Sequence, residues 1–183
     1  MKNKKILIGV SGGIAVYKTC ILVNNLLKSG ADVKVIMTEA ATKFVSPLTF
    51  QALTNHAVYI DMFKIVNKEE VEHISLAKWA DVLVISPATA NTIAKIALGI
   101  ADNLLTTVTM ALPKNTKVVF VPAMNSSMWE NPITQKNVSI LEKIGDKYIF
   151  VSPREGILAC RDKGRGKIAK EESIIEVIKK IVN

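Results

Sequence analysis

The sequence predicts an α/β protein built on a doubly wound parallel sheet, of the Rossmann or flavodoxin-like kind. Short apolar runs alternate along the chain with stretches in which apolar residues recur at helical spacing, as in repeated β-α-β units. The runs are apolar at nearly every position, as expected of strands that helices cover on both faces. The chain has 183 residues, of which 49% are hydrophobic, and this suits one hydrophobic core. We therefore predict a single domain over residues 1–183.

The first β-α-β unit consists of a strand at 5–10, a helix at 14–28 and a second strand at 32–37. The turn Ser11-Gly12-Gly13 joins the first strand to the helix. Free backbone N–H groups at the start of a helix bind anions, so this turn is a candidate phosphate site, with a plain tight turn as the alternative. The turn does not match Gly-x-Gly-x-x-Gly, which favours a mononucleotide or another phosphate over NAD.

The later elements continue the alternation. We expect short helices at 39–42 and 47–53, an extended segment at 58–63, an exposed charged loop at 64–72 and a helix from residue 74. Strands at 80–86, 117–121 and 148–151 then alternate with helices at 93–98, 102–112, 132–144 and 171–182. Residues 152–170 are rich in glycine and in charged residues. They show neither helical nor strand periodicity, which predicts a lid or a disordered segment.

Small or polar residues follow several of the predicted strands, in the segments Ser11-Gly12-Gly13, Pro87 to Thr92 and Pro122 to Asn125. Ligands of doubly wound sheets bind beyond the carboxyl ends of the strands, so we expect these segments and the 152–170 loop to form one site. The Asn125 amide offers two donors, which can hold a carboxylate or a phosphate in a fixed orientation. The alternative is that Asn125 or Ser126 caps a helix that Trp129 anchors in the core.

The net charge of +8 permits several kinds of anionic partner. The charge could indicate nucleic-acid binding, but the lysines are scattered and form no stripe interleaved with aromatic residues. A phosphorylated substrate or cofactor explains the positive field equally well. No apolar run reaches the roughly 20 residues of a membrane span, and the run at 6–10 is too short for a signal peptide, so we expect a cytoplasmic protein. The two cysteines should then be free thiols, with Cys20 in the core and Cys160 as the better candidate for reactivity. We predict no metal site.

Taken together, the motifs resemble one family over almost the whole chain. They are Ser11-Gly12-Gly13-Ile14-Ala15, His73, Pro87-Ala88-Thr89-Ala90-Asn91-Thr92, Gly99 to Thr106, Pro122-Ala123-Met124-Asn125 with Met128-Trp129, and Leu158-Ala159-Cys160. This combination resembles the homo-oligomeric FMN-containing cysteine decarboxylases. The resemblance implies a trimer or a dodecamer with the active site at the subunit interface, a small-molecule substrate, and no nucleic-acid or membrane partner. Many bacterial members of the family carry a fused synthetase domain, and because 183 residues are too few to include one we expect the free-standing form.

The resemblance assigns roles to individual residues. The FMN-lining residues would be Gly12, Gly13, Ile14, Thr38, Thr89, Ala90, Asn91, Thr92 and Ala123. His73 would be the catalytic base, although a lone histidine before a helix is more often a cap or a surface group. Asn125 would clamp the substrate carboxylate. The residues Ile157, Leu158 and Ala159 would form a flap over the substrate, with Cys160 as the proton donor.

The reaction implied by the resemblance is the decarboxylation of 4′-phosphopantothenoylcysteine to 4′-phosphopantetheine in coenzyme A biosynthesis. FMN would oxidise the thiol to a thioaldehyde, carbon dioxide would leave, and the resulting enethiol would be reduced again without NAD(P)H. The alternative is the oxidative decarboxylation of a peptidyl-cysteine, as in lantibiotic synthesis, which stops at the enethiol. Those enzymes lack the Leu-Ala-Cys flap, so Cys160 favours the complete reaction. Flavin prenyltransferases share the fold but lack His73 and the Pro-Ala-Met-Asn motif. A fungal phosphatase-inhibiting subunit also uses this fold but carries long acidic extensions.

Overall fold

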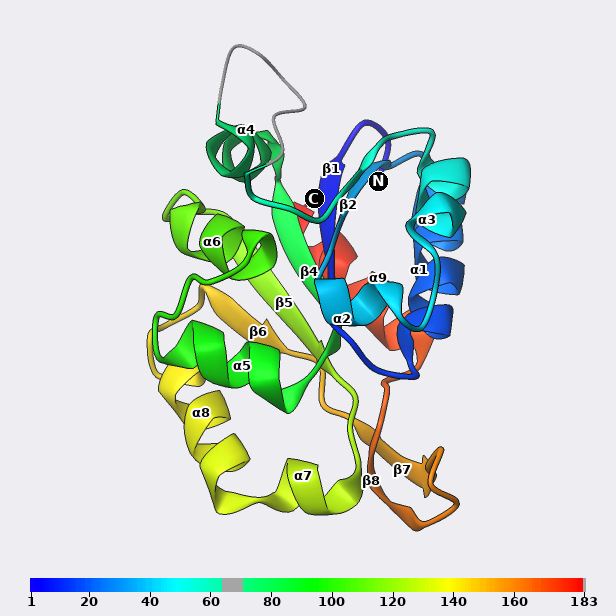
Figure 1. The fold of residues 1–183 in the computed structure, drawn as a ribbon, viewed down its shortest axis with the longest axis vertical. Helices are drawn as coiled ribbons and strands as arrows, with labels where there is room; N and C mark the ends of the chain where they lie inside the picture. The colour runs from blue at the N-terminus through cyan, green and yellow to red at the C-terminus, as the bar shows by residue number, and fades with distance from the viewer. Residues whose placement is uncertain (64–70, 183) are drawn as a thin grey trace.

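The computed structural model describes residues 1–63 and 71–182, which form helices around a central sheet (Figure 1). The strands of this sheet are β1 (Lys5–Val10), β2 (Asp32–Met37), β3 (Val58–Tyr59), β4 (Val82–Ala88), β5 (Lys117–Pro122) and β6 (Tyr148–Phe150). They pair in the order β3-β2-β1-β4-β5-β6, and every pairing is parallel. This is the doubly wound Rossmann order, in which the strand order reverses between β1 and β4. The predicted fold class is confirmed.

Helices cover both faces of the sheet. One face packs against α1 (Val16–Lys28), α2 (Glu39–Thr42), α3 (Pro47–Thr54) and α9 (Glu171–Val182). The other packs against α4 (Glu72–Trp79), α5 (Ala90–Ala97), α6 (Leu104–Ala111), α7 (Ser126–Glu130) and α8 (Pro132–Glu142). Because successive side chains of a strand point to opposite faces, each strand contributes to two separate cores. In β1, Ile6, Ile8 and Val10 face α1, whereas Leu7 faces the other layer.

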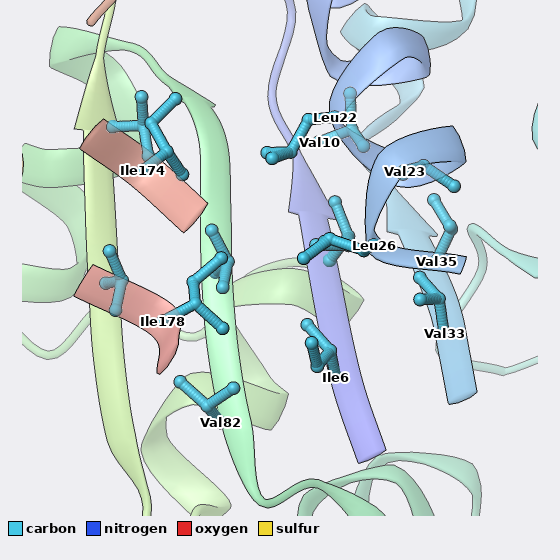
Figure 2. Packing of buried hydrophobic residues seen from close by; sticks show 14 of the residues in the cluster. Ile6, Val10, Leu22, Val23, Leu26, Val33, Val35, Val82, Ile174 and Ile178 are labelled. Carbon is cyan, nitrogen blue, oxygen red and sulfur yellow. The ribbon is translucent and has the colours of Figure 1, made fainter. Parts of the chain in front are cut away.

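Aliphatic side chains dominate the core under α1 and α9 around β1 and β4 (Figure 2). Leu22 and Leu26 of α1 lie over β1, and Ile178 of α9 lies beside Val82 of β4. Leu26, Val82 and Ile178 are fully buried. Burying a side chain of this size stabilises the fold by about 1.5–3 kcal/mol, so these contacts fix the sheet on which the site stands.

β4 begins and ends two residues later than the predicted 80–86 strand, because Pro87 and Ala88 continue it. Proline cannot donate a hydrogen bond to the ladder, and the register between β4 and β5 shifts at this point, between Ile85 and Ala88. Ala88 still accepts a hydrogen bond from the Ala123 N–H at 3.2 Å. The Pro87–Thr92 segment therefore begins inside the sheet rather than after it.

The prediction of a disordered segment at 152–170 is wrong, whereas the role of this segment as a lid stays a prediction. These residues contain an antiparallel hairpin of β7 (Arg154–Ile157) and β8 (Lys163–Lys167), drawn in orange at the lower edge of Figure 1. The strand at β3 covers only part of the predicted extended segment 58–63. Most of the predicted charged loop lies outside the described residues, and Glu72 already belongs to α4. Among the described helices, none is both long and apolar enough to cross a membrane.

Candidate active site

A cavity of about 580 Å³ opens at the carboxyl edge of the sheet, between the start of α1, the loop after β5 and the β7–β8 hairpin. Its volume lies within the usual range of ligand sites in proteins. It is lined by Gly12, Gly13, Ile14, Ala15, Tyr17, Lys18, Thr89, Ala123, Met124, Asn125, Met128, Ile157, Leu158, Ala159, Cys160, Gly166, Lys167 and Ile168. Segments that are far apart in the sequence therefore meet at the place where the strand order reverses.

The hydroxyl of Ser11 ties β1 to β4 at this reversal. Its Oγ donates to the Pro87 carbonyl at 2.6 Å and accepts from the Thr89 N–H at 3.0 Å, and Ser11 is only 1% exposed. Thr89 in turn caps α5, because its Oγ1 accepts from the Thr92 N–H at 3.4 Å. These bonds hold Thr89 at the cavity wall.

The glycine turn after β1 brings the backbone close to its neighbours. A Cβ on Gly12 would lie 2.5 Å from the Cβ of Ala40, so only glycine lets α2 approach. A Cβ on Gly13 would meet nothing nearer than Thr89 Cγ2 at 3.8 Å, and this leaves the backbone of the turn open to the cavity. No side chain caps α1, whose N-cap residue is Ala15. The start of this helix can therefore receive an anion.

The side chain of Asn125 has two separate contacts. Its Oδ1 accepts from the Ser127 N–H at 2.8 Å and so caps α7, as the alternative sequence interpretation expected. Its Nδ2 lies 3.4 Å from Cys160 Sγ. Because the cap fixes which end of the amide is the oxygen, the amino group faces Cys160. The cap and the amide donor are thus compatible roles of one residue.

The β7–β8 hairpin is fastened to the loop after β5 by backbone contacts that require glycine. The Met124 N–H donates to the Gly166 carbonyl at 3.0 Å, and a Cβ on Gly166 would lie 2.3 Å from the Met124 oxygen. A Cβ on Gly164 would lie 2.2 Å from Ser126 Oγ. These contacts bring residues 157–160 to the cavity. At the tip, Cys160 Sγ donates to Asp162 Oδ2 at 3.3 Å.

Positive charge borders the same cavity. Lys18 and Lys167 line it, and both are half-buried. Burial lowers the pKa of Lys18, and the nearby charges of Arg154 and Lys167 lower it further. These cations were not predicted from the sequence as site residues. The sequence feature that could have identified Lys18 is its position in the first turn of the helix that follows the glycine turn.

The cavity brings together most of the residues that the sequence nominated, namely Gly12, Gly13, Ile14, Thr89, Ala123, Asn125, Ile157, Leu158, Ala159 and Cys160. The others lie elsewhere. Thr38 caps α2 by accepting from the Ala41 N–H at 3.3 Å. The first turn of α5 contains Ala90, Asn91 and Thr92, of which Asn91 is exposed and Thr92 is buried.

His73 is also outside the cavity. It is half-buried on α4, and Figure 1 draws α4 at the opposite end of the molecule from α7 and the β7–β8 hairpin. One copy of the chain therefore does not bring the predicted base to Asn125 and Cys160.

Comparison with known proteins places the chain in a family. The Flavoprotein family model matches residues 1–183. A probable phosphopantothenoylcysteine decarboxylase of Streptococcus mutans is 46% identical over 176 residues, which cover 96% of this chain and 97% of that protein. The coenzyme A biosynthesis bifunctional protein CoaBC of Bacillus subtilis is 48% identical over 180 residues, which cover 98% of this chain. The match covers only 43% of that protein, so the chain spans less than half of its length.

A solved structure agrees with these sequence relatives. A mutant of PPC decarboxylase complexed with pantothenoylaminoethenethiol superposes with a TM-score of 0.85 at 32% identity, and the match covers 97% of each chain. The similarity thus extends over the sheet, both helical layers and the hairpin. The chain belongs to the Flavoprotein family and, within it, to the group that contains the phosphopantothenoylcysteine decarboxylases.

Proposed function

We propose that this chain is an FMN-dependent decarboxylase that converts 4′-phosphopantothenoylcysteine to 4′-phosphopantetheine, a step of coenzyme A biosynthesis. The observation that carries the proposal is the approach of the Asn125 amide to the Cys160 thiol, at 3.4 Å, in the cavity beside the glycine turn. The names of the relatives from Streptococcus mutans and Bacillus subtilis support it. So does the likeness to a PPC decarboxylase that binds pantothenoylaminoethenethiol.

The residues of the cavity fit a flavin mononucleotide. The open backbone at Gly13 and the uncapped start of α1 offer donors to a phosphate, while Thr89 and Ala123 add small side chains to the wall. We propose Gly12, Gly13, Ile14, Thr38, Thr89, Ala90, Asn91, Thr92 and Ala123 as the residues that hold the flavin. When bound, the flavin supplies two-electron oxidation of the substrate thiol and later returns the electrons.

The chain's own residues would orient the substrate and supply protons. The Asn125 Nδ2 donates to the substrate carboxylate. This contact holds the carbon–carbon bond that breaks on loss of carbon dioxide in line with the neighbouring π-system. The tip of the hairpin would cover the substrate and exclude water from the cavity through Ile157, Leu158 and Ala159. The Cys160 thiol protonates the enethiol carbon, and His73 accepts the proton of the substrate thiol.

Cys160 separates the complete reaction from the peptidyl-cysteine alternative, which releases the oxidised enethiol. The test is mass spectrometry of the products formed from 4′-phosphopantothenoylcysteine by the FMN-loaded protein. We expect a product that has lost carbon dioxide alone. A product of the wild-type protein that has also lost a pair of hydrogen atoms would contradict the complete reaction. With Cys160→Ser, carbon dioxide should still be released, but the oxidised product should accumulate together with bleached, reduced flavin.

We also propose that the active site is completed by a second copy of the chain, in a trimer or a dodecamer. His73 lies on α4, at the opposite end of the molecule from the hairpin in Figure 1, so a single copy leaves the site without the proposed base. Ile14, Met128 and Ile157 line the cavity yet are 59%, 50% and 68% exposed in one copy. A neighbouring subunit would bury this apolar rim.

The proposed location is the cytoplasm. Cys20 and Cys160 are both free in the described structure, and Cys160 must stay a reduced thiol to act as a proton donor. A reducing compartment keeps it so.

A further inference from the structure

A second, smaller cavity adjoins the candidate active site on the side of α1 that faces α9. It has a volume of about 360 Å³ and lies between α1, the hairpin and the start of α9. Tyr17, Lys18 and Ile168 line both cavities and form their common wall. A long ligand held at Asn125 and Cys160 could therefore extend past this wall.

Three cations from three different elements converge on the common wall. Lys18 comes from α1 and lines both cavities, Arg154 comes from β7 and lines the smaller one, and Lys167 comes from β8 and lines the larger one. All three side chains are half-buried. A Cβ on Gly156 would lie 3.0 Å from Lys167 Cδ and 3.4 Å from its Nζ, so the missing side chain of Gly156 gives Lys167 its place.

No carboxylate of the described residues forms an ion pair with these cations. Arg154 Nε donates to the Ile168 carbonyl at 3.1 Å, which fixes the side chain without neutralising it. Glu171 and Glu172 line the smaller cavity, but Glu171 accepts a hydrogen bond from Asn25 and Glu172 is exposed. The mutual repulsion of Lys18, Arg154 and Lys167 is thus left uncompensated.

The position of Lys18 adds a second unfavourable electrostatic interaction to this repulsion. It lies in the first turn of α1, which has no acidic residue and no side-chain cap. A cation is unfavourable at the amino-terminal end of a helix, because the helix dipole is positive there. A bound anion would relieve both the dipole and the repulsion among the three cations.

We propose that Lys18, Arg154 and Lys167 form a phosphomonoester-binding site on the wall between the two cavities. The phosphate can come from either of two molecules, the end of the substrate opposite its thiol or the flavin. For the substrate, the inference rests on the proposed function, and it explains how the site selects a phosphorylated small molecule over a peptidyl-cysteine. For the flavin, it explains selection of the mononucleotide over riboflavin.

The test compares ligand pairs that differ only in the phosphate. Binding is measured by titration calorimetry for 4′-phosphopantothenate and pantothenate on the FMN-loaded protein, and by flavin fluorescence for FMN and riboflavin on the flavin-free protein. Neither phosphopantothenate nor pantothenate has a cysteine to decarboxylate, so the readout does not depend on turnover. The variants are Lys18→Met and Lys167→Met, which keep the aliphatic stems. Lys163→Met is the matched control, since Lys163 is exposed on β8 and lines neither cavity.

We expect each site variant to weaken binding of the phosphorylated ligand of one pair by about tenfold or more, and to leave binding of the unphosphorylated ligand unchanged. The control variant should bind all four ligands as the wild-type protein does. A loss in the pantothenate pair identifies the substrate phosphate, and a loss in the flavin pair identifies the flavin phosphate. Equal changes in both members of each pair, or no change in any, would overturn the site. Failure of the wild-type protein to decarboxylate phosphopantothenoylcysteine would instead overturn the proposed function and leave these binding results interpretable.

Discussion

At the scale of single residues, Asn125 shows how one side chain can serve the fold and the proposed chemistry at once. Its oxygen is committed to the cap of α7, while its amino group faces the cavity. From the sequence, Asn125 could be recognised either as a helix cap or as a hydrogen-bond donor to a carboxylate, and these two roles were alternatives. Only the structure shows that the two ends of the amide point to different partners.

This division leads to a prediction for Asn125→Asp. Aspartate caps a helix as well as asparagine, so α7 should form, but the new carboxylate should repel the substrate carboxylate. Turnover should fall by at least about a hundredfold while FMN still binds. The control is Asn131→Asp, because Asn131 caps α8 in the same way, accepting from the Ile133 N–H at 2.9 Å, and does not line the cavity. Assays of turnover and FMN affinity check this, and an active Asn125→Asp enzyme would remove Asn125 from the clamp role.

A second residue-scale prediction concerns Lys18 and stability. Burial, with Arg154 and Lys167, lowers the pKa of Lys18, so the unfolded chain binds this proton more tightly than the folded one. Below the lowered pKa the charge opposes folding, and this penalty disappears as the pH rises through the lowered value towards 10.5. Lys18→Met should therefore be more stable than the wild-type apo-protein at neutral pH.

The measurement is urea unfolding of both proteins at neutral pH and near pH 10.5, the ordinary lysine value. The advantage of Lys18→Met should shrink at the alkaline pH. A variant that is equally stable or less stable at neutral pH would show that the three cations do not strain the empty site.

At the scale of elements, the strands of the central sheet were predictable and the hairpin was not. Runs such as Val118 to Val121 are apolar on both faces, and this pattern arises from burial alone. The sequences Arg154–Ile157 and Lys163–Lys167 carry no such pattern, because the hairpin is held by backbone bonds and by the close approach of Gly164 and Gly166. A glycine needed for contact looks in the sequence like a glycine needed for flexibility. The expectation of disorder at 152–170 failed for this reason.

The hairpin should therefore depend on Gly166. Gly166→Ala places a Cβ against the Met124 oxygen and also strains the backbone, since φ is +151°. The strain alone costs about 1–3 kcal/mol. Gly145→Ala is the matched control, because Gly145 has a φ of +111° and no atom within 4 Å of the added Cβ. Both variants should be less stable to urea. Only Gly166→Ala should speed hydrogen exchange of the Met124 amide, which donates to the Gly166 carbonyl in the wild-type protein.

If both variants left the Met124 amide equally protected, the hairpin would not be fastened through Gly166. The same comparison bears on function. Detaching the hairpin should move Cys160 away from Asn125, so Gly166→Ala should lose the reduction step as Cys160→Ser does.

At the scale of the whole molecule, the proposed site depends on how copies of the chain meet. The fold class and most of the cavity wall could be predicted from one chain, because they follow from the order of strands and from what stands at their carboxyl ends. The place of His73 could not. Its role came from the resemblance alone, and α4 holds it far from the cavity of its own copy.

Mixing two inactive variants tests the shared site. His73→Gln and Asn125→Asp should each be inactive alone. If His73 serves a neighbour's cavity, about one quarter of the sites in randomly mixed oligomers should contain both native residues, and activity should return. Co-expression followed by a decarboxylation assay measures this, with light scattering to determine the number of subunits. An inactive mixture in proven mixed oligomers, or an active monomer, would contradict a site built between copies.

The hydroxyl of Ser11 has a consequence for how ligands arrive. Because it bridges the Pro87 carbonyl and the Thr89 N–H, the ends of β1 and β4 are held together in a fixed arrangement in a single copy of the chain. The crevice is then preorganised, and a ligand entering it need not first reorder these two strand ends. Capture at this end of the cavity should be governed by diffusion and by the positive field of the molecule, and conformational opening should be confined to the side of the hairpin.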